Sequence, residues 1–315
     1  MRGEIGWQAI YGHKGRDLEE WSKWPEFFPG IPPDIVTAPT ADHRRMRKEI
    51  IRAFSDKAIQ EQQFIFHHYA NLLMLRWRER DQQIIDIAKW FNFFTFDTFG
   101  DLAFGEPFGS LEGGESHPWV SLIFDTIKIN KMFGFLEEFP LLKKIAQGLT
   151  PADIKRRARD HFELSERKVR QRLARGANDR KDFISYIWKT DGTGLLTQAE
   201  MERNASTLIV AGSETTATTL SAVIYYALKS PQKYARITEE VRSAFESGDE
   251  EVTLTATVNV PYLQACIEET LRLFPPVPIG APRQVGSSGG YVEDYYLPAK
   301  VSCPPIQSTL AYRQY

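Results

Sequence analysis

The chain has 315 residues, of which 42% are hydrophobic and 25% charged, as in an ordinary globular protein. Its formal net charge of −2 argues against a nucleic-acid partner. Two cysteines, Cys266 and Cys303, are too few for a disulfide framework or a closed zinc site, and they favour a reducing, intracellular setting. No stretch approaches the roughly 18 apolar residues that cross a bilayer, so no transmembrane anchor is predicted.

The first forty residues are rich in aromatic residues and proline and have no clear period, which predicts irregular structure. A helix should then begin near Thr40 or Asp42, either of which could cap it. Further helices are expected over about 59–80, 82–104, 118–133 and 151–174. The run at 82–104 is so densely aromatic that it predicts a buried core helix, ended by Gly105, whereas 151–174 should expose a charged, solvated face.

The helix that begins near Thr40 has an unusual apolar stripe. Helical spacing places on it His43, Met46, Arg47, Ile50 and Phe54. Arg47 is therefore expected on the apolar face, where a buried guanidinium needs an anionic partner, such as a carboxylate of another helix. The opposite face carries Arg44, Arg45, Lys48 and Arg52, and it is either a solubilising surface or a docking surface for an acidic protein.

A long helix is predicted between Thr197 and Lys229. Thr197 and Glu200 form a capping box at its start, and Ser230-Pro231 ends it. Its centre, 211–216, reads Ala-Gly-Ser-Glu-Thr-Thr, which is a poor helix-forming segment. Thr215 could bond back to the carbonyl of Ala211 and open a groove beside an acid and a hydroxyl, suited to holding a small ligand and delivering protons to it. The alternative is close packing of the helix on a neighbour through Ala211 and Gly212.

A shorter helix is predicted over about 261–276, between prolines. Glu269 and Arg272 lie three residues apart and share one of its faces, although such a pair is a weak signal by itself. Cys266 lies among apolar neighbours on this helix and is interpreted as a core thiol. Cys303 lies in Val-Ser-Cys-Pro-Pro, a predicted strand edge, without the glycine-rich loop or helix N-terminus that holds a reactive thiolate.

Three separated motifs, and a further helical segment, resemble those of one family, the cytochrome P450 enzymes. The Ala-Gly-x-Glu-Thr-Thr segment at 211–216 is similar to the oxygen-activation motif of that family. The segment at 262–278, followed by Pro282-Arg283, is similar to its Glu-x-x-Arg helix and the strand after it. The spacing of His43 and Arg47 matches a His-x-x-x-Arg motif, and residues 96–105 look like the corresponding helix of fungal members that oxidise secondary metabolites.

The resemblance implies a mainly α, P450-like helical fold with a minor β-sheet, incomplete, with 1–315 as one partial domain. It implies a haem-thiolate monooxygenase that uses O2 and electrons from NADPH–cytochrome P450 reductase to oxidise an apolar small molecule, as in fungal secondary-metabolite biosynthesis. Carried over by residue, Glu214 and Thr215 support protonation of dioxygen beside a groove lined by Ala211 and Gly212. The carried-over propionate contacts are His43, Arg47 and Arg283, and the core-locking pair is Glu269 and Arg272.

The resemblance is partial. Family members are typically held at the endoplasmic reticulum membrane by an N-terminal anchor, and their haem iron is bound by a cysteine in a glycine-rich loop after a Pro-Glu-Arg segment. We expect anchor, segment and loop to be absent between Met1 and Tyr315, and neither Cys266 nor Cys303 to replace the ligand. Two hypotheses follow: a family enzyme, or a truncated, catalytically inactive remnant without haem that has at most an interaction role.

Overall fold

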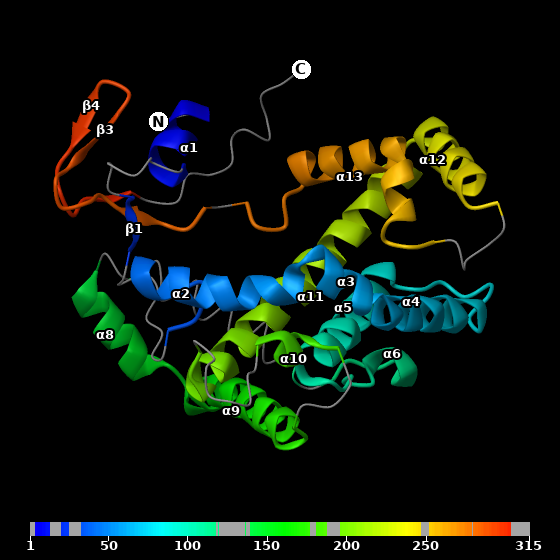
Figure 1. Cartoon of the computed structure of the whole chain (residues 1–315), viewed down its shortest axis with the longest axis horizontal. Helices are drawn as coiled ribbons and strands as arrows, with labels where there is room; N and C mark the ends of the chain where they lie inside the picture. The colour runs from blue at the N-terminus through cyan, green and yellow to red at the C-terminus, as the bar shows by residue number, and fades with distance from the viewer. Residues whose placement is uncertain are drawn as a thin grey trace. The chain divides into compact units, whose positions relative to one another are not determined.

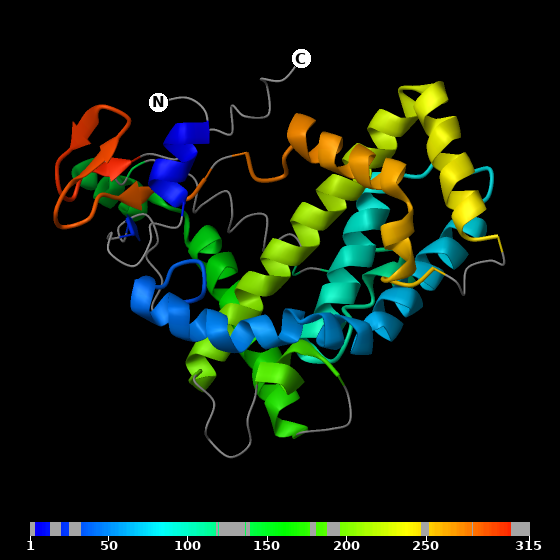
Figure 2. The same ribbon diagram turned by 45° about the horizontal axis from the view of Figure 1, so that its top comes forward.

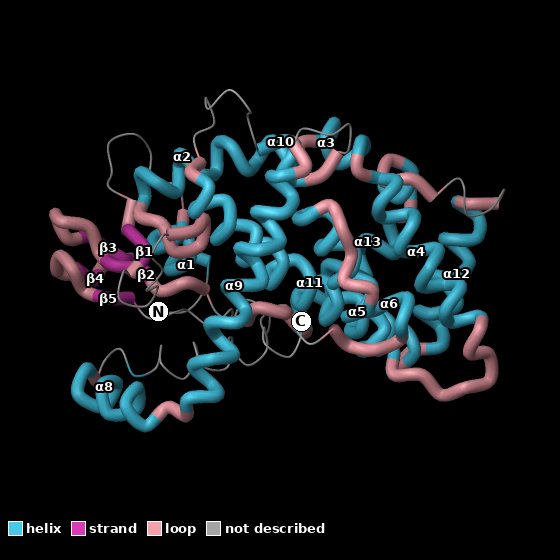
Figure 3. The backbone as a smooth tube through the Cα atoms, turned by 90° about the horizontal axis from the view of Figure 1, so that it is seen from below, coloured by secondary structure: helices cyan, strands magenta, loops and turns pink. Residues whose placement is uncertain are grey.

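The structure is a computed structural model of the chain, and it describes residues 4–12, 20–24, 33–117, 119, 136, 139–176, 181–187, 196–246, 252–278 and 280–303. These residues are predominantly helical, with two small sheets (Figures 1 and 3). Two compact units divide the chain: Pro25–Glu214 form one, and Met1–Trp24 with Thr215–Tyr315 form the other. The division falls inside the longest helix, between Glu214 and Thr215.

The unit formed by Pro25–Glu214 is helical. Its elements are α2 (Thr40–Ile50), the 3-10 helix η2 (Ile51–Phe54), α3 (Asp56–Glu61), α4 (Gln63–Arg78), α5 (Ile87–Phe104), α6 (Ser110–Gly113), α8 (Pro140–Leu149), α9 (Ala152–Ala174), α10 (Phe183–Ile187) and the first part of α11 (Gln198–Leu228). Helix α5 packs against α4, as Figure 2 shows, and also against α6, α9 and α10. It is therefore the centre of this unit.

Helix α5 is buried because its apolar residues surround its axis. Among its buried residues are Trp90, Phe91, Phe93, Phe96 and Phe104. Asp86 caps its first turn by accepting a hydrogen bond from the Lys89 N–H, and Gly105 ends it in the left-handed conformation at φ 71°. A residue with a side chain is strained at that φ. The prediction of a buried core helix ended by Gly105 is thus confirmed, although the helix begins at Ile87 and not near 82.

Asp97, in the middle of α5, organises the loop that leads to α6. Its carboxylate accepts hydrogen bonds from the backbone N–H groups of Phe108, Ser110 and Leu111 at 3.0, 3.2 and 2.7 Å. The side chain is almost completely buried, and burial raises the pKa of Asp97 even though these N–H groups favour the charged form. A single buried acid thus supplies acceptors for a turn whose backbone donors would otherwise be unpaired.

The unit formed by Met1–Trp24 and Thr215–Tyr315 contains both sheets. Its elements are α1 (Glu4–Tyr11), β1 (Ser22–Lys23), the remainder of α11, α12 (Pro231–Ala244), the 3-10 helix η5 (Ala256–Asn259), α13 (Pro261–Leu273), β2 (Arg283–Gln284), β3 (Gly290–Val292), β4 (Tyr295–Leu297) and β5 (Ser302–Cys303). Strands β1, β2 and β5 form an antiparallel sheet in that order, and β3 pairs with β4 as a hairpin. Figure 3 shows the strands gathered near α1.

The prediction of irregular structure before residue 40 is wrong for two segments, because Glu4–Tyr11 are helical and Ser22–Lys23 form a strand. Both depend on distant partners. Ile10 and Trp21 lie in one apolar cluster with Val285, Val292 and Cys303. The Tyr11 hydroxyl also donates to the Ala281 carbonyl at 2.8 Å. Local periodicity could not reveal contacts made some 270 residues away along the chain.

Other helix boundaries differ from the predicted ones for local reasons. The run expected over about 59–80 is interrupted at Gln62, whose buried amide donates to the carbonyls of Ala53 and Ala58. Helix α2 does begin at Thr40, but Pro39 occupies its N-cap position, and neither Thr40 nor Asp42 caps it. Helix α9 matches the prediction for 151–174, and α13 ends at Leu273, short of 276. The helix predicted at 118–133 lies outside the described residues, except at Trp119.

Candidate functional site

Helix α11 carries the candidate site at its centre and begins at the predicted capping box. The Thr197 hydroxyl accepts from the Glu200 N–H at 3.2 Å, and the Glu200 carboxylate accepts from the Thr197 N–H at 2.8 Å. The helix spans 31 residues, or about 46 Å at 1.5 Å per residue. Hydroxyls bond back to carbonyls four residues earlier at Ser213 (to Ile209), Thr219 (to Thr215) and Ser221 (to Ala217). The centre is therefore rich in the local bonds that bend or loosen helices.

Gly212 lies against Phe99 of α5. A Cβ atom at residue 212 would come within 2.2–2.5 Å of three ring atoms of Phe99, closer than real Cβ contacts allow. This supports the packing interpretation of Gly212, because the missing side chain lets α11 approach α5. The two interpretations remain compatible, since a helix fixed in this way presents its next residues in a defined direction.

The four predicted residues at this centre differ in exposure. Ala211 is exposed, Gly212, Glu214 and Thr215 are half-buried, and the intervening Ser213 is buried. Burial raises the pKa of the Glu214 carboxyl above that of an ordinary glutamate. Glu214 therefore keeps its proton to a higher pH than a solvated acid, as a proton-delivering group requires.

His43 and Arg47 share helix α2, as predicted, but the expectation that Arg47 is buried is wrong. Arg47 is exposed and His43 is half-buried, whereas the buried residues of α2 are Met46, Glu49 and Ile50. The buried face thus follows Met46 and Ile50 and excludes Arg47. An exposed guanidinium needs no carboxylate from another helix, so its predicted role toward a propionate stays a prediction.

Arg45 takes part in a contact that the sequence did not predict. Its guanidinium donates to both carboxylate oxygens of Glu200 at 3.1 and 2.5 Å and to Asp42 at 3.0 Å. The hydrogen bond to Glu200 is the largest cause of the raised pKa of Arg45 and of the lowered pKa of Glu200. Glu200 thus caps α11 and fixes α2 to it. The sequence placed Arg45 on a solubilising or docking face, because no local pattern reveals a partner that lies 155 positions away.

Glu269 and Arg272 form the predicted pair on α13. The Arg272 guanidinium donates to the two Glu269 oxygens at 2.6 Å each, and this bond is the largest cause of the lowered pKa of Glu269. The fork-to-fork geometry fixes both side chains more firmly than a single contact would. Their side chains are 45% and 29% exposed, so the pair is accessible to further partners.

Arg283 lies in β2, the central strand of the three-stranded sheet. It pairs in register with Lys23 on one side and Cys303 on the other. Its Nη1 donates to the Trp21 carbonyl at 3.3 Å, and its guanidinium lies over the Tyr11 ring at 5.5 Å. Its Nε is buried and has no hydrogen-bond partner among the described residues. A buried N–H of this kind could be satisfied by an anionic oxygen of a ligand.

The described residues include a group suited to a haem propionate but no cysteine suited to the haem iron. The cation at Arg283 has an unsatisfied buried donor suited to a propionate. Neither cysteine fits the iron, however: Cys303 is buried in β5 within an apolar cluster, and Cys266 lies inside α13. Neither occupies a loop or a helix N-terminus that would stabilise a thiolate. The expectation that neither replaces the axial ligand therefore has a structural basis.

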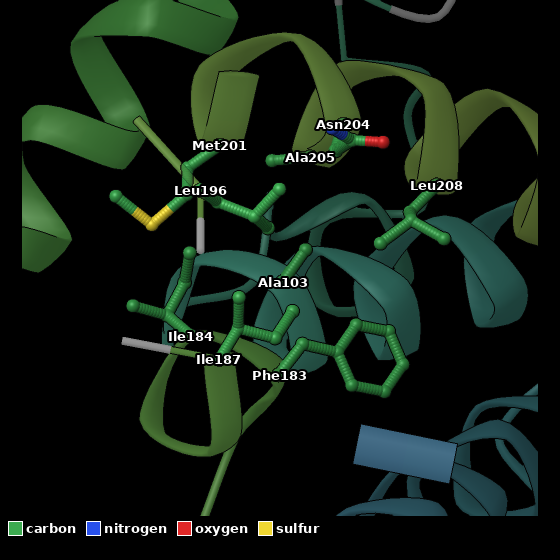
Figure 4. Close-up of a pocket in the computed structure, with 9 residues that line it drawn as sticks. All are labelled: Ala103, Phe183, Ile184, Ile187, Leu196, Met201, Asn204, Ala205 and Leu208. Atoms are coloured by element: carbon green, nitrogen blue, oxygen red, sulfur yellow. The ribbon is translucent and has the colours of Figure 1, made fainter. Parts of the chain in front are cut away.

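A small apolar cavity lies beside α11, but it is not a substrate site. Figure 4 shows its lining, which comes from α5, α10, α11 and, at Leu196, the segment before α11: Ala103, Phe183, Ile184, Ile187, Leu196, Met201, Asn204, Ala205 and Leu208. Its volume is about 10 Å³, room for about one water molecule. The Asn204 amide is already bonded, to the Glu200 carbonyl and the Ile35 N–H. The cavity is therefore a packing defect of the core.

The structure brings together part of the predicted site. Glu269 contacts Arg272 directly, and Ala211, Gly212, Glu214 and Thr215 follow one another on α11. His43 and Arg47 belong to the unit that includes Glu214, and Arg283 belongs to the unit that begins again at Thr215. The convergence of these three residues on one ligand stays a prediction.

The chain is similar to curated fungal proteins named as a monooxygenase and a hydroxylase. The chain is 36% identical over 304 residues to cytochrome P450 monooxygenase astJ of Aspergillus oryzae, covering 94% of this chain and 60% of the relative. It is 40% identical over 290 residues to the trichothecene C-4 hydroxylase of Trichoderma arundinaceum, covering 91% of this chain and 57% of the relative. The chain thus spans about 60% of the length of these relatives.

A solved structure and a family model point to the same family as these relatives. The haem domain of cytochrome P450DA aligns with a TM-score of 0.72 over 90% of this chain and 62% of that one, at 17% identity, which supports the predicted P450-like fold. Among the described residues, no helix has both the length and the apolar character needed to cross a membrane. A sequence model of the Cytochrome P450 family matches residues 20–313. The chain therefore belongs to the cytochrome P450 family.

Proposed function

We propose that this chain belongs to a haem-thiolate monooxygenase that oxidises an apolar small molecule in fungal secondary metabolism. It would supply the residues that protonate dioxygen and those that bind the haem propionates. The observation that carries the proposal is the centre of α11, where the half-buried Glu214, its pKa raised by burial, precedes the hydroxyl of Thr215. The relatives support the enzyme hypothesis over the remnant hypothesis, because they are named as monooxygenases and as a hydroxylase.

Each group has a role that its environment suits. Haem held by a thiolate, when bound, supplies the redox chemistry with O2. Glu214 holds a proton at a higher pH than a solvated acid, and Thr215 can pass a proton through its hydroxyl. Gly212 fixes the helix against Phe99, so that both groups keep one orientation. Arg283, with His43 and Arg47, would bind the propionates.

The electron donor would be NADPH–cytochrome P450 reductase, as the family implies. The exposed residues Arg44 and Lys48 of α2 offer cations to an acidic partner. Arg45 and Arg52 contribute less to this surface, because Arg45 pairs with Glu200 and Arg52 pairs with Glu49 at 2.7 Å. The docking face is therefore narrower than the sequence predicted.

Thr215→Ala tests the role of α11. The chain spans only part of its relatives, so the test uses a chimera that joins it to the portions of the trichothecene C-4 hydroxylase that it does not match. We expect less product and more hydrogen peroxide per NADPH consumed, since loss of the hydroxyl interrupts proton delivery, with a change of about tenfold or more.

Thr216→Ala is the matched control, because Thr216 is the exposed neighbouring hydroxyl on the same helix. We expect it to behave as the unaltered chimera, and we expect Thr215→Ser to restore coupling. Equal peroxide release from Thr215→Ala and Thr216→Ala would show that Thr215 has no role in proton delivery.

A further inference from the structure

Helix α12 holds α13 by charge and capping, not by a shared apolar core. The two helices lie side by side, as Figures 1 and 2 show. Along its whole length, Pro231–Ala244, which the structure describes throughout, α12 has no buried residue. The buried residue of α13 is a polar one, Thr270, so the helix pair cannot gain much from burial of apolar surface. The polar contacts between them must therefore determine how α13 is placed.

The first turn of α13 is capped by a residue of α12. Helix α13 starts with Val260 at the N-cap, whose side chain cannot accept a hydrogen bond, and Pro261, which has no N–H. The next two N–H groups, of Tyr262 and Leu263, donate to the two carboxylate oxygens of Glu240 at 2.9 Å each. A carboxylate at this end also interacts favourably with the helix dipole.

A ring contact and an electrostatic effect continue the pairing in an antiparallel sense. The guanidinium of Arg236 lies 3.9 Å from the centre of the Tyr262 ring. Farther along, the charge of Lys233 contributes to the lowered pKa of Glu269, after the larger effect of the hydrogen bond from Arg272. Glu240 and Arg236 of α12 thus both face the first turn of α13, and the charge of Lys233, earlier on α12, acts on Glu269, later on α13.

We propose that Glu240 is a positioning residue: its carboxylate, by accepting both free N–H groups of the first turn of α13, sets the register of that helix on α12 and so places the Glu269–Arg272 pair. The proposed function enters only as the reason why the placement of this pair matters. The placement itself can be measured on the 315-residue chain without haem, so the proposal can fail while the proposed function stands, and the reverse.

Hydrogen exchange detected by mass spectrometry measures the cap directly. In Glu240→Gln one oxygen that can accept a hydrogen bond remains, and in Glu240→Ala none does. We expect exchange of the peptide spanning 261–268 to accelerate about tenfold or more in Glu240→Ala and by a smaller factor in Glu240→Gln. Glu239→Gln, an exposed neighbour of the same chemistry, should leave this peptide unchanged.

The pKa of Glu269, in the last turns of α13, measures the register of α13 on α12. In the unaltered chain, Lys233→Gln should raise the pKa of Glu269, followed by NMR of its labelled carboxyl carbon, because a nearby cation is removed. In the Glu240→Ala background the same substitution should have less effect, since α13 no longer keeps its place beside Lys233. A plain loss of stability would not remove this coupling selectively.

Three results would overturn the proposal. The first is equal protection of peptide 261–268 in Glu240→Ala and Glu239→Gln. The second is an undiminished effect of Lys233→Gln on Glu269 when Glu240 is replaced. A loss of protection that is uniform across α5 and α13 would also count against it, because a general destabilisation is not a change of register.

Discussion

Replacing Asp182 with asparagine is expected to lower the free energy of unfolding by about 3–5 kcal/mol, because it leaves a buried cation without its partner. The Arg172 guanidinium donates to both Asp182 oxygens at 2.7 and 3.2 Å, and the two side chains are 3% and 0% exposed. Arg172 also donates to the Gly176 carbonyl at 2.9 Å. Asparagine keeps the shape of Asp182 but removes the charge.

The same pair packs against the end of the core helix. A Cβ atom at Gly105 would lie 3.1 Å from Arg172 Cδ and from Asp182 Oδ2, so the glycine leaves the space that the pair occupies. Asp182 also accepts from the Ser185 N–H at 2.8 Å, in the turn that begins α10. Loss of the charge should therefore loosen α9, α10 and the end of α5 together.

Urea denaturation followed by circular dichroism measures this effect. The matched control is Glu79→Gln, which breaks an exposed pair three residues apart, with Arg76 at 2.9 Å, and should cost at most about 1 kcal/mol. Similar losses in Asp182→Asn and Glu79→Gln would contradict the view that burial makes the Arg172–Asp182 pair important.

Glu214→Gln is expected to reduce product formation by the chimera about a hundredfold or more, since the carboxyl is the proposed proton donor. The effect should depend on pH with a defined sign. Burial raises the pKa of Glu214, so its protonated form persists above the range of a solvated acid, and activity should fall as pH rises through that raised pKa. Glutamine cannot titrate, so the variant should show a low, flat profile over the same range.

Stability gives an independent check of the same group. For an acid whose folded-state pKa is raised, stability is fully present below the unfolded value of about 4.3 and is lost as pH rises through the folded pKa. Glu214→Gln should therefore be more stable than the unaltered chain at neutral pH, and the difference should vanish in acid. A variant that is less stable at neutral pH would show that the carboxylate is not disfavoured by its surroundings.

The sequence predicted what local patterns control. The capping box at Thr197 and Glu200, the ending of α5 at Gly105 and the Glu269–Arg272 pair all depend on residues within four positions of one another. Each of these local contacts was confirmed because the chemistry of a helix turn is the same wherever the helix lies, whereas the core-locking role of the Glu269–Arg272 pair stays a prediction. The α11 motif also carried the family resemblance, which its relatives confirmed.

What the sequence did not predict depends on distant contacts. Arg45 was assigned to a surface because its partner, Glu200, is far along the chain. Arg47 was assigned to the apolar face with Met46 and Ile50, whereas the structure buries Glu49 beside these two residues and leaves Arg47 exposed. Helix α1 was missed because its stability comes from a shared cluster with Val285 and Val292. A free acid on one helix gives no local signal that it caps another, so Glu240 was missed too.

The carbon monoxide difference spectrum of the reduced chimera tests the central claim most directly. Thiolate-bound haem gives the band at about 450 nm for which the family is named. We predict that the chimera shows this band and that it survives Cys266→Ser and Cys303→Ser, because neither cysteine is placed to bind iron. A folded chimera without the band, or a band lost with either substitution, would contradict the account.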